Sequence, residues 1–223
     1  FEGLNLLLNE QQDKAIDAFI EAVQLDPDTT ELHFALGNLF RRRGEFERAV
    51  RVHQHLLSRA DLKPADRQRA QRALAQDFDR AGLFDRAEAA WQALEHTPFE
   101  AEARLALLTL HERSRDWAGA IRDAQALEAA GSGSFAARIA HHHCELALDA
   151  DAAGRQEDAG QALAAAMQAS PDAPRPHLLA GERAAHAGDA AAALAHWDRL
   201  RALAPAVFPL VAEAYAAQAL ASG

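Results

Sequence analysis

The chain of 223 residues contains 56 Ala and 29 Leu but only 13 β-branched residues, a composition that favours helices and leaves too few strand-forming side chains for an ordinary sheet. Its formal net charge of −10 argues against nucleic acid as the partner, because phosphate binding needs a basic surface. A single Cys excludes an internal disulfide and a multi-thiolate zinc site, and no apolar stretch reaches the about 18 residues that span a bilayer.

An internal repeat of 34 residues organises the chain. Small residues and prolines recur at this interval, as in the pairs Gly3 and Gly37, Ala15 and Ala49, and Pro171 and Pro205. The interval is that of the tetratricopeptide repeat, a helix–turn–helix unit of about 34 residues. We therefore predict an all-α fold of about six and a half such repeats, stacked into a right-handed superhelix.

In chain order, one array over residues 1–223 is predicted to contain repeats at residues 1–29, 30–64, 68–100, 101–133, 140–173 and 174–207. Residues 208–221 then form part of a seventh repeat or a capping helix. The fourth repeat fits least well, since His111 and Ala124 stand off the pattern. An uncapped last repeat would expose apolar surface, so self-association is possible.

Each recurring residue type has a packing reason. A small residue such as Gly37 or Ala49 is expected where two helices approach most closely, and His53 occupies a position where the pattern expects an aromatic side chain. Between the paired helices, a positive φ is expected at Gly44, Gly82, Gly154 and Gly188. The three Trp residues, Trp91, Trp117 and Trp197, are interpreted as inter-helix packing and not as a ligand cage.

A positive island marks the candidate binding site. Residues 41–80 hold 11 basic and 6 acidic residues, whereas the rest of the chain holds 12 and 27. The first helices of stacked repeats line a concave groove that suits peptides. The residues predicted to face this groove and bind a partner are Asn38, Arg41, Arg69, Arg72 and Gln76. Because guanidinium groups bind carboxylates in two-pronged fashion, the hypothesis is a site for an acidic peptide or chain terminus.

A second interpretation of the same charges stays open. The arginines Arg41, Arg42, Arg43 and Arg51 could form a solvated face of exposed ion pairs, each of which contributes little to stability.

Nothing in the sequence indicates catalysis or a metal site. No phosphate loop, nucleophile elbow or zinc-ligand helix pattern is present. In the run His141-His142-His143, neighbouring side chains on a helix point about 100° apart and cannot share one metal ion. His141 and Glu145 are one turn apart, but two ligands make a poor site, and His143 is assigned to packing. We expect a protein that is not an enzyme and carries no catalytic residues and no metal.

Several stretches resemble one family more closely than the generic repeat. Residues 6–15, 37–54, 81–88 and 143–148 are similar to the lipopolysaccharide assembly protein B family, and the likeness covers about the first two thirds of the chain. The resemblance implies a regulatory adaptor in lipopolysaccharide biosynthesis, which couples the membrane protease FtsH to degradation of the deacetylase LpxC. It also implies an N-terminal membrane helix, a repeat region on the cytoplasmic face of the inner membrane, and a C-terminal rubredoxin-like zinc module.

The resemblance also implies which parts of the longer protein this chain contains. Because it begins at Phe1, not at Met, we expect a soluble fragment of a longer protein, with the anchor and the zinc module outside it and no cofactor of its own. The alternative function is a generic peptide-binding or chaperone-like module with a different partner, and this alternative includes a periplasmic location.

Overall fold

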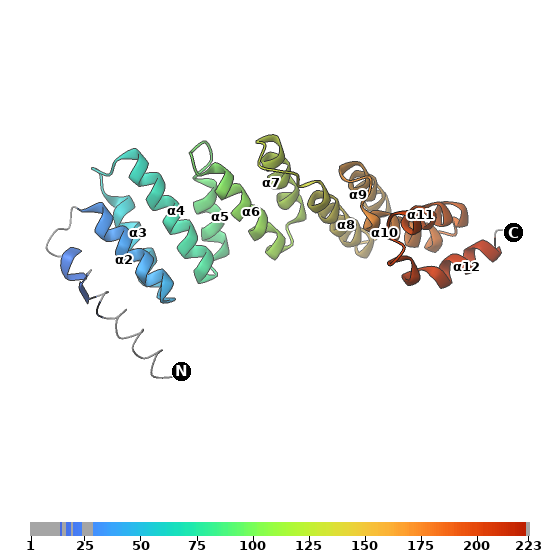
Figure 1. Cartoon of the computed structure of the whole chain (residues 1–223), viewed down its shortest axis with the longest axis horizontal. Helices are drawn as coiled ribbons and strands as arrows, with labels where there is room; N and C mark the ends of the chain where they lie inside the picture. The colour runs from blue at the N-terminus through green and yellow to red at the C-terminus, as the bar shows by residue number, and fades with distance from the viewer. Residues whose placement is uncertain (1–13, 15–16, 19, 24–28, 222–223) are drawn as a thin grey trace. The chain divides into compact units, whose positions relative to one another are not determined.

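The computed structural model describes residues 14, 17–18, 20–23 and 29–221. It consists of helices, with no strand among these residues (Figure 1). Most of the repeat predicted at residues 1–29, including Gly3 and Ala15, lies outside the described residues. The chain divides into two compact units, Phe1–Leu110 (unit 1) and His111–Gly223 (unit 2), which are described one at a time.

Unit 1 is built from helix pairs joined by short turns. Its helices are α2 (Thr30–Arg42), α3 (Phe46–Ser58), α4 (Pro64–Ala81), α5 (Phe84–Gln92) and the larger part of α6 (Glu100–Ser114). Consecutive helices lie side by side, α2 with α3, α3 with α4 and α4 with α5. Between α4 and α5 the buried side chains of Phe78, Leu74 and Trp91 belong to one apolar cluster of the unit.

Unit 2 continues the same pattern after α6. Its elements are α7 (Trp117–Ala129), α8 (Ala136–Ala152), α9 (Gln156–Ala169), α10 (Pro174–His186), α11 (Ala190–Leu203), the short 3₁₀ helix η1 (Phe208–Leu210) and α12 (Ala212–Ala221). The pairs α8–α9 and α10–α11 pack as hairpins, with Cys144 and Leu163 in the core of the first and Trp197 in the core of the second. These paired helices confirm the all-α tetratricopeptide fold predicted from the sequence.

Small residues set the distance between the helices of a pair, as the sequence predicts. A Cβ atom placed on Gly37 of α2 would lie 2.5 Å from His53 Nε2 on α3, and one placed on Gly181 would collide with the Trp197 indole. Ala49 and Ala87 are fully buried at the corresponding helix contacts. Close approach of the helices therefore depends on the absence of a side chain at these positions.

The fourth repeat, which departs from the pattern, has the large residue on its first helix and the small residue on its second helix. Here the large residue, His111, is on α6, and the small residue, Gly119, is on α7, where an added Cβ would lie 2.9 Å from the imidazole. His111 Nδ1 donates to Asp123 Oδ2 at 2.8 Å, and Ala124 is fully buried beside it. At the positions that correspond to Gly37 and His53, this repeat has Leu108 and Ala124, both fully buried, so the small residue stands on the second helix and Ala124 departs from the pattern.

The turns within the pairs end each first helix at a left-handed residue. Gly44 and Gly82 have φ values of 77° and 72°, which a side chain disfavours. Gly154 and Gly188 adopt the same conformation, so the predicted positive φ is confirmed at all four glycines. In unit 2, Asp116 and Asp189 then begin the second helices as N-caps and accept hydrogen bonds from Gly119 N and Ala192 N.

Candidate functional site

The five residues predicted to bind a partner lie on two first helices of unit 1. Asn38 and Arg41 are on α2, and Arg69, Arg72 and Gln76 are on α4. The two helices contact each other directly. We call the surface formed by these five residues the first-helix surface.

Arg41 is held by a buried carboxylate. Its Nη1 donates to Asp77 Oδ1 at 2.9 Å and to the Ala73 carbonyl at 3.1 Å, while its Nη2 donates to Asn38 Oδ1 at 2.5 Å. Asp77 is fully buried and also accepts a hydrogen bond from His53 Nδ1 at 2.5 Å. Because a buried carboxylate needs compensating partners, this network ties α2, α3 and α4 together, and Arg41 has a structural role.

Arg69 makes a two-pronged ion pair with the neighbouring first helix. Its two terminal nitrogens donate to the Glu31 carboxylate at 2.5 and 3.0 Å, and its guanidinium lies 4.1 Å from the centre of the Phe34 ring. The Arg69 guanidinium lowers the pKa of the Glu31 carboxyl. Since the two side chains are 43% and 67% exposed, water screens the pair and its contribution to stability is small.

Arg72 and Gln76 share one carboxylate on the next first helix. Arg72 Nε and Gln76 Nε2 donate to the two oxygens of Glu102, on α6, at 2.7 and 3.0 Å. Arg72 also lies 5.3 Å from the centre of the Phe99 ring. Both side chains of the ion pair are about two fifths exposed, so a ligand can reach them.

The structure therefore brings the five predicted residues together but shows a charge-balanced surface. The three acidic partners, Glu31, Asp77 and Glu102, were not predicted from the sequence. Each lies 30 to 38 positions from its arginine, close to one repeat length, and that spacing is the signal that could have revealed them. The binding role of the first-helix surface stays a prediction.

The other three arginines of the solvated-face interpretation, Arg42, Arg43 and Arg51, differ in whether they have an acidic partner. Arg43 and Arg51 pair with Glu45 and Glu47 at 2.9 and 3.7 Å, as the interpretation of exposed ion pairs expects. Arg42, at the end of α2, is exposed and has no hydrogen-bond or ion-pair partner among the described residues.

Unit 2 repeats the pairing of arginines with acidic residues on neighbouring first helices. Arg138 on α8 binds both oxygens of Glu112 at 2.5 Å, and Arg175 on α10 binds Glu145 at 2.5 Å. Arg183 pairs with Asp151. The same arrangement occurs in both units, where each of these pairs joins two successive first helices.

The histidine run does not converge on a common point. His141 is exposed and accepts a hydrogen bond from Arg175, whereas His142 is buried and donates to Glu112 Oε1 at 2.7 Å. Burial lowers the pKa of His142. The sequence assigned the packing role to His143, but His142 is the more deeply buried of the two. No group of three or more His, Cys, Asp or Glu side chains in the described part of the chain could hold a metal ion.

The one cysteine lies inside unit 2. Cys144 is fully buried, and burial raises the pKa of its thiol to about 11. The thiol is therefore protonated at neutral pH and unreactive.

The amino-acid sequence of the chain is similar to those of curated proteins. No protein-family model matches the chain. The chain is 43% identical over 147 residues to lipopolysaccharide assembly protein B of Escherichia coli (strain K12), an alignment that covers 66% of this chain and 38% of that protein. It is a homologue of lipopolysaccharide assembly protein B over this stretch. The resemblance seen in the sequence is thereby confirmed.

A second relative extends the match. Lipopolysaccharide assembly protein B of Haemophilus influenzae is 33% identical over 190 residues, which cover 79% of this chain and 47% of that protein. The chain thus spans less than half the length of the curated relatives it matches.

More distant likenesses are found among solved structures. They include MamA, with a TM-score of 0.49 and 16% identity over 76% of this chain and 88% of that one. YrrB, described as a TPR protein with an unusual peptide-binding site, has a TM-score of 0.46 and 17% identity over 89% and 98% of the two chains.

None of the helices in the described residues is long and apolar enough to cross a bilayer.

The chain is a non-catalytic scaffold of tetratricopeptide hairpins, in keeping with relatives that are named for assembly and not for a reaction.

Proposed function

We propose that this chain is the protein-binding part of an adaptor in lipopolysaccharide assembly, on the cytoplasmic face of the inner membrane, which presents the deacetylase LpxC to the protease FtsH. The observation that carries the proposal is the 43% identity over 147 residues to lipopolysaccharide assembly protein B. The tetratricopeptide hairpins supply a rigid surface that suits this role.

The first-helix surface is the proposed contact for one of these proteins. Its exposed pairs, Arg69–Glu31 and Arg72–Glu102, can exchange an internal carboxylate for one of a partner at little cost, because exposed ion pairs are weak. Arg41 cannot do so, since its release would leave Asp77 buried with one charged partner fewer. Binding is therefore assigned to Arg69, Arg72 and Gln76, while Arg41 and Asn38 keep the helices in place.

Titration calorimetry with purified LpxC and purified FtsH cytoplasmic domain tests this assignment. We expect one of the two to bind the chain, and the double variant Arg69→Ala/Arg72→Ala to weaken that binding about tenfold or more, as central charged contacts do. Arg122→Ala removes an exposed arginine of α7 and serves as the matched control. Unchanged affinity in the double variant would exclude the first-helix surface, and failure of both proteins to bind would favour a peptide-binding module with another partner.

A further inference from the structure

The arginines of the positive island that remain free lie at the hairpin turns. Arg42 ends α2 and Arg80 stands one residue before the end of α4, and both are exposed without a hydrogen-bond or ion-pair partner among the described residues. Arg86, in the first turn of α5, lies 4.9 Å from the centre of the Phe78 ring and has no carboxylate partner there. Among the described residues of the positive island, Arg42 and Arg80 are thus cations at the hairpin turns that a ligand could use without breaking an internal pair, and Lys63, before α4, is a further exposed cation.

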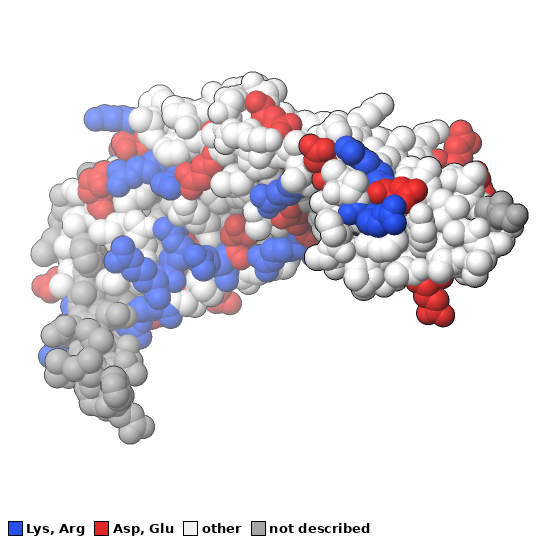
Figure 2. All heavy atoms as spheres, turned by 45° about the vertical axis from the view of Figure 1, so that its right-hand side comes forward, with Lys and Arg blue, Asp and Glu red and all other residues white. Residues whose placement is uncertain are grey.

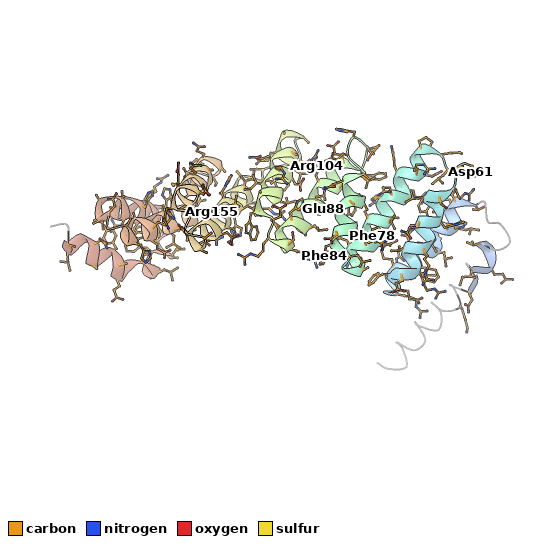
Figure 3. All side chains as sticks on the ribbon, turned by 180° about the vertical axis from the view of Figure 1, so that it is seen from behind. Asp61, Phe78, Phe84, Glu88, Arg104 and Arg155 are labelled. Carbon is orange, nitrogen blue, oxygen red and sulfur yellow. The ribbon has the colours of Figure 1, made fainter. Side chains whose placement is uncertain are left out.

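A groove with a volume of about 530 Å³ lies between the α2–α3 turn and the α4–α5 turn. Its apolar lining comes from Phe46 and Leu83 at the starts of the second helices and from Ala81 at the end of α4. Leu83 is 42% exposed, and among the described residues of unit 1 it shares such exposure of a large apolar side chain with Leu105. Figure 3 shows Phe78 and Phe84 at this same end of the α4–α5 hairpin.

The rim of the groove is fixed in position. Gly44 and Gly82 give the two turns the same left-handed conformation, so equivalent positions of the two hairpins border the groove. Arg48 lies 4.0 Å from the centre of the Phe40 ring and pairs with Glu45 at 2.6 Å. A groove with a pre-formed rim loses little conformational entropy when it binds a ligand.

We propose that this turn groove binds a protein segment that carries an apolar side chain between carboxylates. The apolar side chain covers Leu83 and Phe46, and the carboxylates meet the unpaired guanidinium groups of Arg42, Arg80 and Arg86, which stand within three residues of the groove lining.

The recessed lining favours a protein segment over a lipid surface, and the charge of this part of the chain favours a segment that carries carboxylates. Residues 41–80 carry a net charge of +5 in a chain of net charge −10, and Figure 2 shows basic side chains gathered on this part of unit 1 among acidic ones. Glu45 and Glu47 belong to the lining, but Glu45 is paired with Arg43 and Arg48 and Glu47 with Arg51, so neither carboxylate stands unpaired against the segment. A recessed apolar lining with mixed charges on its rim suits one side chain and its flanking carboxylates.

A fluorescein-labelled peptide, Glu-Glu-Leu-Phe-Glu-Glu, is a direct probe, and its fluorescence anisotropy is measured with the full chain. We expect saturable binding that weakens as salt rises from about 0.05 to about 0.3 M, because exposed charges are screened over this range. The peptide Lys-Lys-Leu-Phe-Lys-Lys, with the same apolar residues and reversed charge, should not bind.

Two variants locate the site. Arg42→Glu/Arg80→Glu should raise the dissociation constant about tenfold, since two attractions become repulsions, whereas Arg122→Glu should not change it. Leu83→Asp should abolish binding and still fold, because Leu83 has N-cap geometry (φ −88°, ψ 67°) close to that of the natural cap Asp116 (φ −78°, ψ 77°). Leu105→Asp, at an exposed leucine of α6, is its matched control.

Three results would overturn the proposal. They are equal binding of both peptides, unchanged binding in the Arg42→Glu/Arg80→Glu and Leu83→Asp variants, and binding to phosphatidylglycerol vesicles without binding to the acidic peptide. The double variant Arg69→Ala/Arg72→Ala should bind the probe normally, so failure of the turn groove and failure of the proposed function are separate outcomes.

Discussion

A glycine on α2 sets how closely that helix approaches α3. Because a Cβ on Gly37 would lie 2.5 Å from His53 Nε2, we expect Gly37→Ala to destabilise unit 1 by about 1–3 kcal/mol through overpacking. Urea unfolding followed by Trp fluorescence measures this change. Gly160→Ala, on α9, is the control, because no neighbouring atom lies within 4 Å of its Cβ and the better helix propensity of Ala should add about 0.5–1 kcal/mol.

The side chain of Asp77 carries the charge network of unit 1. Asp77→Ala would leave Arg41 and buried His53 without their shared acceptor, and we expect a loss of about 3–5 kcal/mol, as for other broken buried pairs. Glu31→Ala removes the exposed partner of Arg69 instead and should cost less than about 1 kcal/mol. Equal losses of unfolding free energy in the two variants would contradict the structural role given to Asp77.

We expect two histidines to make the α10–α11 hairpin sensitive to acid. His177 Nδ1 and His196 Nδ1 lie 3.3 Å apart. Burial lowers the pKa of both imidazoles, and for His177 the neighbouring His196 and Arg199 lower it further. The unfolded state then takes up protons more readily than the folded state below the ordinary imidazole pKa of about 6.5. Stability is therefore complete above about pH 6.5 and falls as the pH drops towards the folded pKa values.

The prediction concerns how steeply the free energy of unfolding changes with pH. Unfolding free energy measured in urea should fall between about pH 7 and pH 5, and His177→Gln/His196→Gln should make the slope shallower. Buried His142, whose pKa is also lowered, should keep part of the dependence. His96→Gln, at a side chain that is 89% exposed, is the control. A double variant with the slope of the parent chain would contradict the assignment.

The sequence predicts the elements well where one residue decides the geometry. Gly44, Gly82, Gly154 and Gly188 mark the turns because only a residue without Cβ adopts a positive φ freely. The close contact between His111 and Gly119 could not be predicted from the sequence pattern in the same way. The pattern looks for a small residue on the first helix, whereas packing needs only one small and one large residue, on either helix.

For the whole molecule, the sequence predicts the place of the charged site better than its chemistry. Asn38, Arg41, Arg69, Arg72 and Gln76 do lie together on α2 and α4, because the repeat fixes which residues share a face. Their engagement by Glu31, Asp77 and Glu102 depends on side chains one repeat away. A profile of net charge along the chain adds up these charges but does not show which of them are paired.

Proteolysis reconstituted from purified components is the decisive test of the proposed adaptor role. FtsH in lipid vesicles degrades LpxC in the presence or absence of the full-length protein that contains this chain, and the half-life of LpxC is measured on gels. We expect a shorter half-life with the protein present and a return towards the basal value with Arg69→Ala/Arg72→Ala. An LpxC half-life that is the same with and without the protein would contradict the adaptor role.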